Sequence, residues 1–207
     1  MPKKVVVTGL DGILWQGDGL LRGTYREMAN EGLTNFKARP DEKDTRNILR
    51  AIGSGVVGKA TSEISSIARA VSSRSIEQVD DKMVSLLRQF SPDEYRLVGM
   101  STAPDFVVEL ALNQLRTEVG IPFDKTHVLD SSFPTSDGRY SAKPNKLHKQ
   151  EAVRDLVNSL GVLTVDVGFI NGISDMGWAN AYCETTVPIN PGAALTRRLY
   201  PTGTEAA

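Results

Sequence analysis

The sequence has little of what secreted and zinc-binding proteins contain. Its 207 residues include one cysteine, Cys183, and two histidines, His127 and His148. A single cysteine excludes an internal disulfide and is typical of a protein from the reducing cytosol. Two histidines far apart, without clustered cysteines, argue against a zinc site. We therefore expect a cytoplasmic protein, in which Cys183 is a small buried apolar residue.

Net charge and long apolar runs are also missing. The 24 Lys and Arg residues are interspersed with 25 Asp and Glu residues, which leaves a formal net charge of -1. This balance predicts no binding to nucleic acid or to an anionic membrane surface. No apolar run approaches the ~20 residues that span a bilayer. The first four residues lead directly into a strand pattern, so we expect no signal peptide.

The sequence does contain alternating strand and helix patterns. A β-branched run at 3–8 predicts the first strand, and similar runs predict strands at 95–100, 126–129, 163–170 and 185–187. Helical patterns lie between the later strands, at 105–118, 146–160 and 174–182, and a last one ends at 199. Strands that alternate with helices form a parallel sheet with right-handed crossovers. The fold class predicted is therefore α/β, with a Rossmann-like core.

The region between the first two strands has a different character. Four helical patterns follow one another without a strand, at 21–31, 44–52, 59–72 and 76–90, and Gly53-Ser54-Gly55 is expected to end the second. We interpret this region as a helical cap. The predicted organisation is a core of residues 1–14 and 91–207 and a cap of residues 15–90.

The first strand ends in a polar turn. Its last residues run into Gly-Leu-Asp-Gly at 9–12, which places Asp11 at the carboxyl end of the strand. In an open α/β sheet, ligands bind at that end. Asp11 is thus the first candidate for a functional residue, although Asp-Gly pairs also occur as simple turns.

Four segments resemble the motifs of the haloacid dehalogenase (HAD) superfamily, in the family's order. Gly-Leu-Asp-Gly-Ile-Leu at 9–14 is similar to the family's Asp-x-Asp-Gly-Thr-Leu. Ser-Thr-Ala-Pro-Asp-Phe at 101–106 resembles the Ser-x-x-Pro-Asp-Phe of the phosphoserine-phosphatase-like branch. Asp-Gly-Arg at 137–139 resembles that branch's hairpin before the lysine helix, and 170–175 resembles the fourth motif, Gly-Asp-x-x-x-Asp. The resemblance implies the HAD core with a cap inserted after its first strand.

The same resemblance implies a ligand site at the strand ends, beneath the cap. Besides Asp11, the residues assigned to this site are Gly9, Gly12, Trp15, Ser101, Thr102, Lys149 (with Lys143 and Lys146 as alternatives), Asn171 and Asp175. Several also have purely structural interpretations. Ser101 is a possible helix cap, Lys149 a possible exposed helix lysine, and Trp15 a possible core or hinge aromatic.

Two carboxylates of the family's site are missing. In the family, the first aspartate of motif one attacks phosphorus and binds Mg²⁺, and the leading aspartate of motif four supplies another metal oxygen. In this chain these positions are Gly9 and Asn171. Because Mg²⁺ relies on anionic oxygens, we expect weak or absent Mg²⁺ binding and no other cofactor. Without nucleophile and metal, the aspartyl-phosphate route is not available.

Asp11 remains as an acid or base. Without Mg²⁺, Lys149 would be the main positive charge near it, and an opposite charge within ~4–6 Å favours the ionised carboxylate. We therefore predict Asp11 to act as a base rather than an acid. Gly9 is expected to leave room for a ligand group or a water, and Ser101 with nearby N–H groups to hold an anion.

Three functions follow from these residues. The first, which we favour, is an enzyme that performs metal-free acid–base chemistry on a small anionic or carbonyl-bearing metabolite, with Asp11, Lys149 and their neighbours. The second is a non-catalytic module that binds a ligand or a partner. The third is a phosphomonoesterase that acts through Asp11 itself. The cap carries no recognisable specificity motif, and the sequence predicts no oligomeric state.

Overall fold

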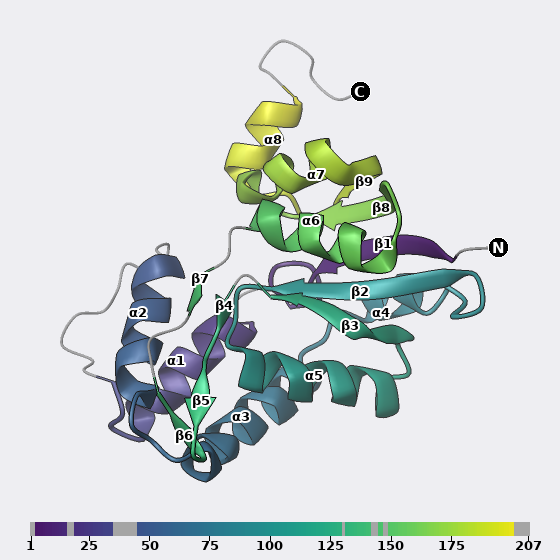
Figure 1. Ribbon diagram of the computed structural model, residues 1–207. Coiled ribbons are helices and arrows are strands. Elements are labelled where there is room, and N and C mark those ends of the chain that lie inside the picture. Colours follow the sequence, from purple (N-terminus) through teal and green to yellow (C-terminus); the bar gives the residue numbers. More distant parts are fainter. Residues whose placement is uncertain are drawn as a thin grey trace.

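Five parallel strands form the central sheet of this computed structural model, which describes residues 3–15, 19–34, 45–129, 131–141, 145–146 and 149–200 (Figure 1). The strands, in spatial order, are β3 (Phe123–Leu129), β2 (Tyr95–Ser101), β1 (Lys4–Gly9), β8 (Val165–Ile170) and β9 (Cys183–Pro188). The chain builds the sheet outward from β1 on one side and then crosses to the other. The carboxyl ends of β1 and β8 flank the point where the order reverses, where ligands bind in open α/β sheets. The predicted α/β class is confirmed.

The valines of β1 explain its central position. Val5 and Val7 face one side of the sheet and Val6 faces the other, and all three are buried. Val6 pairs in register with Leu97 of β2 and Val167 of β8. A strand that is apolar on both faces requires helices on both faces.

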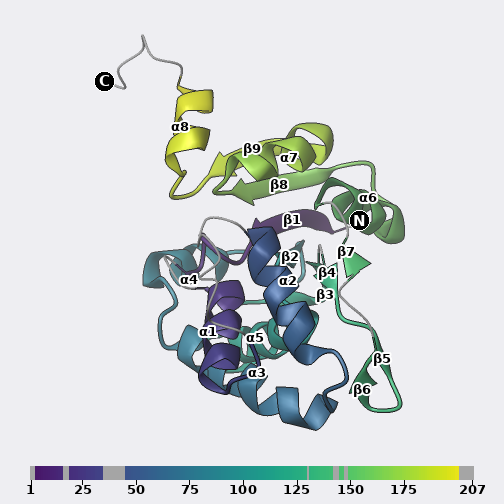
Figure 2. The same ribbon diagram turned by 90° about the vertical axis from the view of Figure 1, so that its left-hand side faces the viewer.

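The two faces of the sheet carry different layers (Figures 1 and 2). One face is covered by α6 (Lys149–Leu160), α7 (Met176–Tyr182) and α8 (Ala193–Leu199), whose buried residues pack on Val5 and Val7. The other face is covered by α5 (Asp105–Thr117), and the helices inserted after β1 pack beyond it. The inserted helices are α1 (Leu20–Asn30), α2 (Thr45–Val56), α3 (Thr61–Ile76) and α4 (Asp81–Leu87).

The inserted helices share one hydrophobic cluster with the core. This cluster joins residues of α1, α2 and α3 to Val6, Leu97 and the buried face of α5. The indole Nε1 of Trp15 donates a hydrogen bond to the Ser75 carbonyl of α3 (2.7 Å), and the Asp80 N–H donates to the Leu14 carbonyl (3.0 Å). The cap is therefore fastened to the core through buried contacts near the end of β1.

Two predicted helix boundaries in the cap were wrong. Helix α2 continues through Gly53-Ser54-Gly55 to Val56, because the small residues allow close packing: a Cβ at Gly55 would lie 2.5 Å from the Leu33 carbonyl oxygen. The predicted helix 76–90 is shorter, since α4 begins at Asp81. The side chain of Asp80 accepts hydrogen bonds from the backbone N–H groups of Lys82 and Met83, which fixes that start.

A hairpin from the core reaches the cap. Strands β5 (Thr135–Ser136) and β6 (Arg139–Tyr140) are joined by Asp137 and Gly138, both with positive φ (50° and 71°), as the Asp-Gly turn signal predicts. Backbone hydrogen bonds connect this hairpin to the α2–α3 loop: Gly58 N–H to Tyr140 O, Tyr140 N–H to Lys59 O, and Thr61 N–H to Gly138 O. The hairpin thus closes the far side of the cap.

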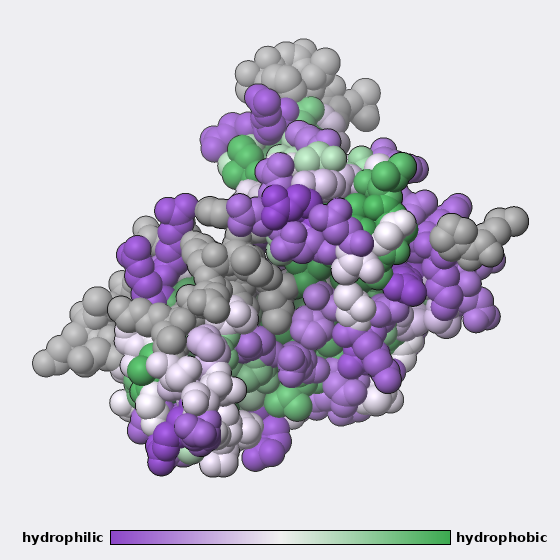
Figure 3. Space-filling view, viewed as in Figure 1, coloured by the Kyte–Doolittle hydropathy of each residue, from purple (hydrophilic) through white to green (hydrophobic). Residues whose placement is uncertain are grey.

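Three short elements complete the fold. They are β4 (Ser131–Ser132), its antiparallel partner β7 (Asn145–Lys146), and a 3-10 turn, η1 (Ile173–Asp175). Because Lys146 belongs to β7, the helix predicted from 146 begins at Lys149 instead. No helix among the described residues is long and apolar enough to cross a bilayer. On the face shown in Figure 3, hydrophilic and hydrophobic residues are mixed in small areas.

Cys183 lies at the start of β9 and belongs to the same hydrophobic cluster as Trp178. It is half-buried, and burial raises the pKa of its thiol to about 12. A thiol with this pKa is protonated at neutral pH and is a poor nucleophile. The prediction of a structural cysteine fits this environment, and Trp178 is fully buried in the core as predicted.

Candidate active site

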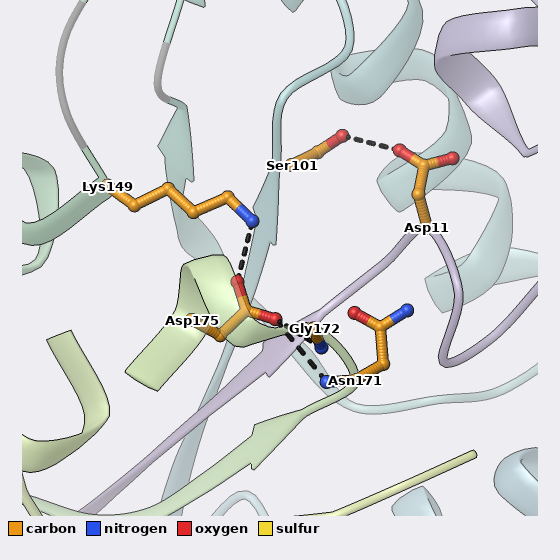
Figure 4. Close-up of polar contacts among 6 residues, drawn as sticks. All are labelled: Asp11, Ser101, Lys149, Asn171, Gly172 and Asp175. Atoms are coloured by element: carbon orange, nitrogen blue, oxygen red, sulfur yellow. Dashed lines mark hydrogen bonds and ion pairs between the residues drawn. The ribbon is translucent and has the colours of Figure 1, made fainter. Parts of the chain in front are cut away.

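Three strand ends bring the polar residues of the site together. Because β1, β2 and β8 are parallel neighbours, the residues that follow them meet at one edge of the sheet. Figure 4 shows Asp11 after β1, Ser101 at the end of β2, and Asn171, Gly172 and Asp175 after β8. Lys149, at the start of α6, points into the same region.

Ser101 holds one oxygen of the Asp11 carboxyl. Its Oγ donates a hydrogen bond to Asp11 Oδ2 (3.1 Å) and accepts one from the N–H of Ala103 (3.0 Å). Ser101 is 4% exposed, so these contacts form away from water. The hydroxyl therefore serves both interpretations considered for it, because it supports the turn into α5 and also orients Asp11.

The second oxygen of Asp11 has a different environment. Oδ1 is enclosed and has no hydrogen-bond partner among the described residues. It faces the first turn of α1, where a Cβ at Gly19 would lie 1.9 Å from it. The N–H groups of Leu20 and Leu21 act on the carboxyl with their partial positive charge but stay outside hydrogen-bond geometry with Oδ1. A glycine at 19 is thus required for the carboxyl to approach the helix.

Burial sets the protonation of Asp11. Desolvation raises the pKa of its carboxyl above the usual 3.8, and the Ser101 hydrogen bond, the N–H groups of Leu20 and Leu21 and the charge of Lys149 only oppose this rise. Lys149 lowers the pKa of Asp11 as predicted, but burial outweighs it, so the net shift runs against the predicted preference for the ionised base.

Lys149 is neutralised by another carboxylate. Its Nζ lies 2.6 Å from Asp175 Oδ1, and Asp175 Oδ2 accepts hydrogen bonds from the N–H groups of Asn171 (3.3 Å) and Gly172 (3.2 Å). Asp175 is 3% exposed. This network fixes the turn after β8. Of the alternative lysines, Lys143 lies outside the described residues, as does the side chain of Lys146 in β7.

Asn171 packs on Gly12. Gly12 has a φ of 83°, a conformation that favours glycine, and a Cβ there would lie 1.6 Å from Asn171 Nδ2. The amide side chain extends toward the space beside Asp11 (Figure 4). Gly12 therefore determines both the turn after β1 and the position of the Asn171 amide.

The space beside Gly9 is occupied by Ile13. A Cβ at Gly9 would lie 3.3 Å from Ile13 Cδ1, and Ile13 is fully buried. Ile13 therefore borders the space beside Gly9, where room for a ligand group or a water was expected. The residue beside Gly9 is therefore an apolar side chain.

A pocket of about 250 Å³ opens at this edge of the sheet. Its lining residues are Asp11, Gly12, Gly19, Leu21, Arg22, Thr45, Thr102 and Asn171. Asp11, Gly12, Thr102 and Asn171 were predicted site residues. Gly9, Ser101, Lys149 and Asp175 are not among the lining residues, and Trp15 lies in the core, 2% exposed.

Sequence reasoning missed the cap's contribution to the pocket. Gly19, Leu21 and Arg22 come from the first turn of α1, and Thr45 begins α2. None belongs to a motif. Their place in the chain was the one signal, because the first residues of a helix that follows the Asp11 turn are expected to lie close to that turn.

The oxygen donors present do not match what Mg²⁺ requires. Gly9 and Asn171 offer no carboxylate, both oxygens of Asp175 are bonded, and burial raises the pKa of Asp11. The described residues include no group of three or more His, Cys, Asp or Glu side chains that could hold a metal ion. Within the described part of the chain, the donor set at this edge of the sheet does not fit a hard cation that depends on anionic oxygens.

By sequence, the chain matches no protein-family model and no curated protein. Structure comparison does find similar proteins. A protein of unknown function from Bordetella pertussis Tohama I has a TM-score of 0.71 at 12% identity, and the match covers 99% of this chain and 98% of that one.

Two of the similar structures have stated activities. A phosphoserine phosphatase, captured as an analogue of its phospho-aspartyl intermediate, has a TM-score of 0.56 at 14% identity, over 96% of this chain and 91% of its own. A HAD family hydrolase from Salmonella enterica serovar Typhi has a TM-score of 0.53 at 11% identity, over 99% and 74%. At such identities the likeness concerns the fold. The chain therefore has the fold of the HAD superfamily hydrolases, as its four motifs predicted.

Proposed function

We propose that this chain is a HAD-fold enzyme that binds a small anionic or carbonyl-bearing metabolite and uses Asp11 as its proton donor, without Mg²⁺. The observation that carries the proposal is the state of the Asp11 carboxyl. It lies in the wall of the pocket, burial raises its pKa, and one of its oxygens has no hydrogen-bond partner among the described residues. Carboxyl groups with raised pKa values in clefts are typical general acids.

The surroundings of Asp11 suit proton transfer to a ligand oxygen. Ser101 fixes the orientation of the carboxyl through Oδ2. The amide of Asn171 and the hydroxyl of Thr102 line the same pocket and can orient a carbonyl or hydroxyl group. In the proposed step, the Asp11 proton passes to the carbonyl oxygen of the ligand while water takes a proton from the adjacent carbon, which gives the enol. On return, solvent supplies a proton to the carbon and the Asp11 carboxylate takes back the proton from the oxygen.

The phosphatase alternative has little support at this site. The similar phosphoserine phosphatase forms a phospho-aspartyl intermediate, whereas this chain has Gly9 at the nucleophile position, with Ile13 against it. Weak or absent Mg²⁺ binding remains part of the proposal. So do a cytoplasmic location and the lack of affinity for nucleic acid.

The experiment is a search for proton transfer in the absence of metal. Small oxo and hydroxy acids are incubated with the protein in D₂O and EDTA, and deuterium incorporation is followed by NMR. A general acid contributes about 10²- to 10⁴-fold, so Asp11→Asn is expected to lower the rate by at least about 100-fold. Asp155→Asn is the matched control, since that carboxylate is 59% exposed on α6.

Two results would contradict the proposal. One is an Asp11→Asn variant as active as the wild type. The other is Mg²⁺-dependent release of phosphate from p-nitrophenyl phosphate, which would restore the phosphatase alternative.

A non-catalytic binding module is the second candidate, and one contact favours it. The Asp11 carboxyl faces the first turn of α1. Its role in this alternative is structural, because it holds the inserted helices against β1. Under this alternative, Asp11→Asn leaves ligand binding intact and the wild type shows no turnover of any substrate.

A further inference from the structure

Asn171 has a side-chain amide that forms no contact of its own with polar groups of the fold. The residue follows β8 at the point where the strand order reverses, and it lines the pocket together with Asp11. Neither its Oδ1 nor its Nδ2 forms a hydrogen bond with another described residue. An amide carries two N–H donors and one acceptor oxygen, so these groups are left for water or a ligand.

The backbone of Asn171 is held on both sides. Its N–H donates to Asp175 Oδ2 (3.3 Å), and its carbonyl accepts a hydrogen bond from the N–H of Gly192 (3.1 Å). The side chain lies directly against Gly12, because a Cβ at that position would be 1.6 Å from Asn171 Nδ2. A donor that is fixed by such contacts needs little reorganisation when charge develops on a ligand.

Asp11 and Asn171 reach the same part of the pocket. They follow the neighbouring strands β1 and β8, and Gly12, on which the amide packs, is the residue after Asp11. Figure 4 shows the amide extending toward the space beside the Asp11 carboxyl. A carbonyl oxygen has two lone pairs and accepts from two donors at once. One ligand oxygen can therefore receive the Asp11 proton and a hydrogen bond from Asn171.

A second donor matters because charge builds up on that oxygen. When water removes a proton from the carbon beside a carbonyl, negative charge moves to the oxygen, and the Asp11 proton joins it there to give the enol. A hydrogen bond from Asn171 Nδ2 to this oxygen is stronger in the transition state than in the bound ketone, so it accelerates the step. An ionised aspartate in place of Asn171 would instead oppose the developing charge.

Resting on the proposed function, we infer that Asn171 is a second catalytic residue, whose amide N–H binds the carbonyl oxygen that Asp11 protonates. The inference narrows the substrate class to carbonyl compounds that carry a hydrogen on the adjacent carbon. The pocket volume of about 250 Å³ is below the ~300–1,000 Å³ of sites for drug-sized ligands, so the compound is small.

Deuterium exchange with two variants tests the catalytic role. Pyruvate, 2-oxobutyrate and butanone are incubated with the full chain in D₂O and EDTA, and exchange at the carbon beside the carbonyl is followed by NMR. Removing one such donor costs about 10²- to 10³-fold in kcat, so Asn171→Leu is expected to lower kcat by at least about 100-fold and to change KM by less than about fivefold. Asn171→Asp, which has the same shape without the N–H donors, is expected to lose at least as much. Asn113→Leu, exposed on α5, is the matched control and keeps the wild-type rate.

The contact itself is tested by NMR of the amide. The side-chain amide signals of Asn171 are assigned in isotope-labelled wild-type protein, and the compound that exchanges fastest is added to saturation. These signals are expected to shift, because the amide N–H gains an acceptor. A residue that only supports the turn after β8 would keep them in place.

Thermal unfolding of each variant separates a lost donor from a lost fold. If Asn171→Leu is unfolded, the decision rests on Asn171→Asp and on the amide signals of the wild type. The inference is overturned if a folded variant keeps the wild-type rate or if the amide signals do not move. Exchange that is lost in Asp11→Asn but kept in Asn171→Leu refutes the role of Asn171 alone, whereas no exchange by the wild type refutes the proposed function as well.

Discussion

Two aspartates at the same sheet edge have opposite environments. Asp175 is fully satisfied: Lys149 lies 2.6 Å from one oxygen, and two backbone N–H groups donate to the other. Asp11 has a hydrogen bond from Ser101 to one oxygen, and its other oxygen is enclosed without a partner among the described residues. Burial raises the pKa of Asp11.

The difference indicates which of the two aspartates stabilises the fold and which has an oxygen left for a ligand. A buried charge with complete partners stabilises a turn, and its environment leaves little for a ligand to improve. A buried carboxyl with an unused oxygen is costly for folding alone, and such sites are where function is expected. Under the proposed function, Asp175 supports the site and Asp11 is its reactive group.

The largest expected effect is the loss of stability on removal of Asp175, the aspartate whose oxygens are both bonded. Asp175→Ala removes the partner of Lys149 and the acceptor of two N–H groups. Breaking a buried ion pair costs about 3–5 kcal/mol, and because Lys149 is 24% exposed we expect about 3 kcal/mol of lost unfolding free energy. Urea denaturation measures the loss. Asp155→Ala, the exposed control, is expected to change stability by less than about 0.5 kcal/mol, and equal losses in the two variants would refute the contrast.

A smaller loss of stability is expected at Ser101, which supports the turn into α5 and also orients Asp11. Ser101→Ala removes the hydrogen bond to Asp11 and leaves the Ala103 N–H without its acceptor. Losing a buried hydrogen bond costs about 1–2 kcal/mol of unfolding free energy. The same change should raise the pKa of Asp11 further, since the Ser101 bond lowers it. NMR titration of a labelled Asp11 carboxyl checks the direction, and an unchanged or lower pKa would show that Ser101 does not stabilise the carboxylate.

The smallest expected effect is a change in the pH dependence of stability when Asp11 is replaced by Asn. Because the folded pKa of Asp11 is raised above 3.8, its contribution to stability is complete below that pH and is lost as the pH rises through the folded pKa. Asp11→Asn has no such group, so it should gain stability relative to the wild type between acid and neutral pH. Denaturation curves from pH 4 to pH 8 measure the gain. Parallel pH profiles for the two proteins would show that folding does not raise the pKa of Asp11.

Much of the fold followed from the sequence because its signals are local. The β-branched run of β1, the Pro at the start of α5 and the Asp-Gly turn each report the conformation of a few neighbouring residues. The convergence of Asp11, Ser101 and Asn171 followed from a general rule, since the ends of parallel strands meet at one edge.

The electrostatics of the site did not follow, because they depend on distances between separate elements. The ion pair of Lys149 with Asp175 leaves Asp11 under the control of burial, and no residue spacing reveals it. The contact of Ile13 with Gly9 is also a matter of side-chain direction. Arg22 entered the pocket through the packing of α1, which a helical pattern alone does not orient.

The hairpin that reaches the α2–α3 loop has a consequence for motion. Its hydrogen bonds join the cap to a core segment about eighty residues later in the chain, between Gly58 and Tyr140 among others. A rigid-body swing of the cap would have to break these bonds together with the buried contacts of Trp15. Opening of the far side of the cap and melting of the hairpin are thus one cooperative event, and ligand exchange without it would proceed through local fluctuation around the first turn of α1.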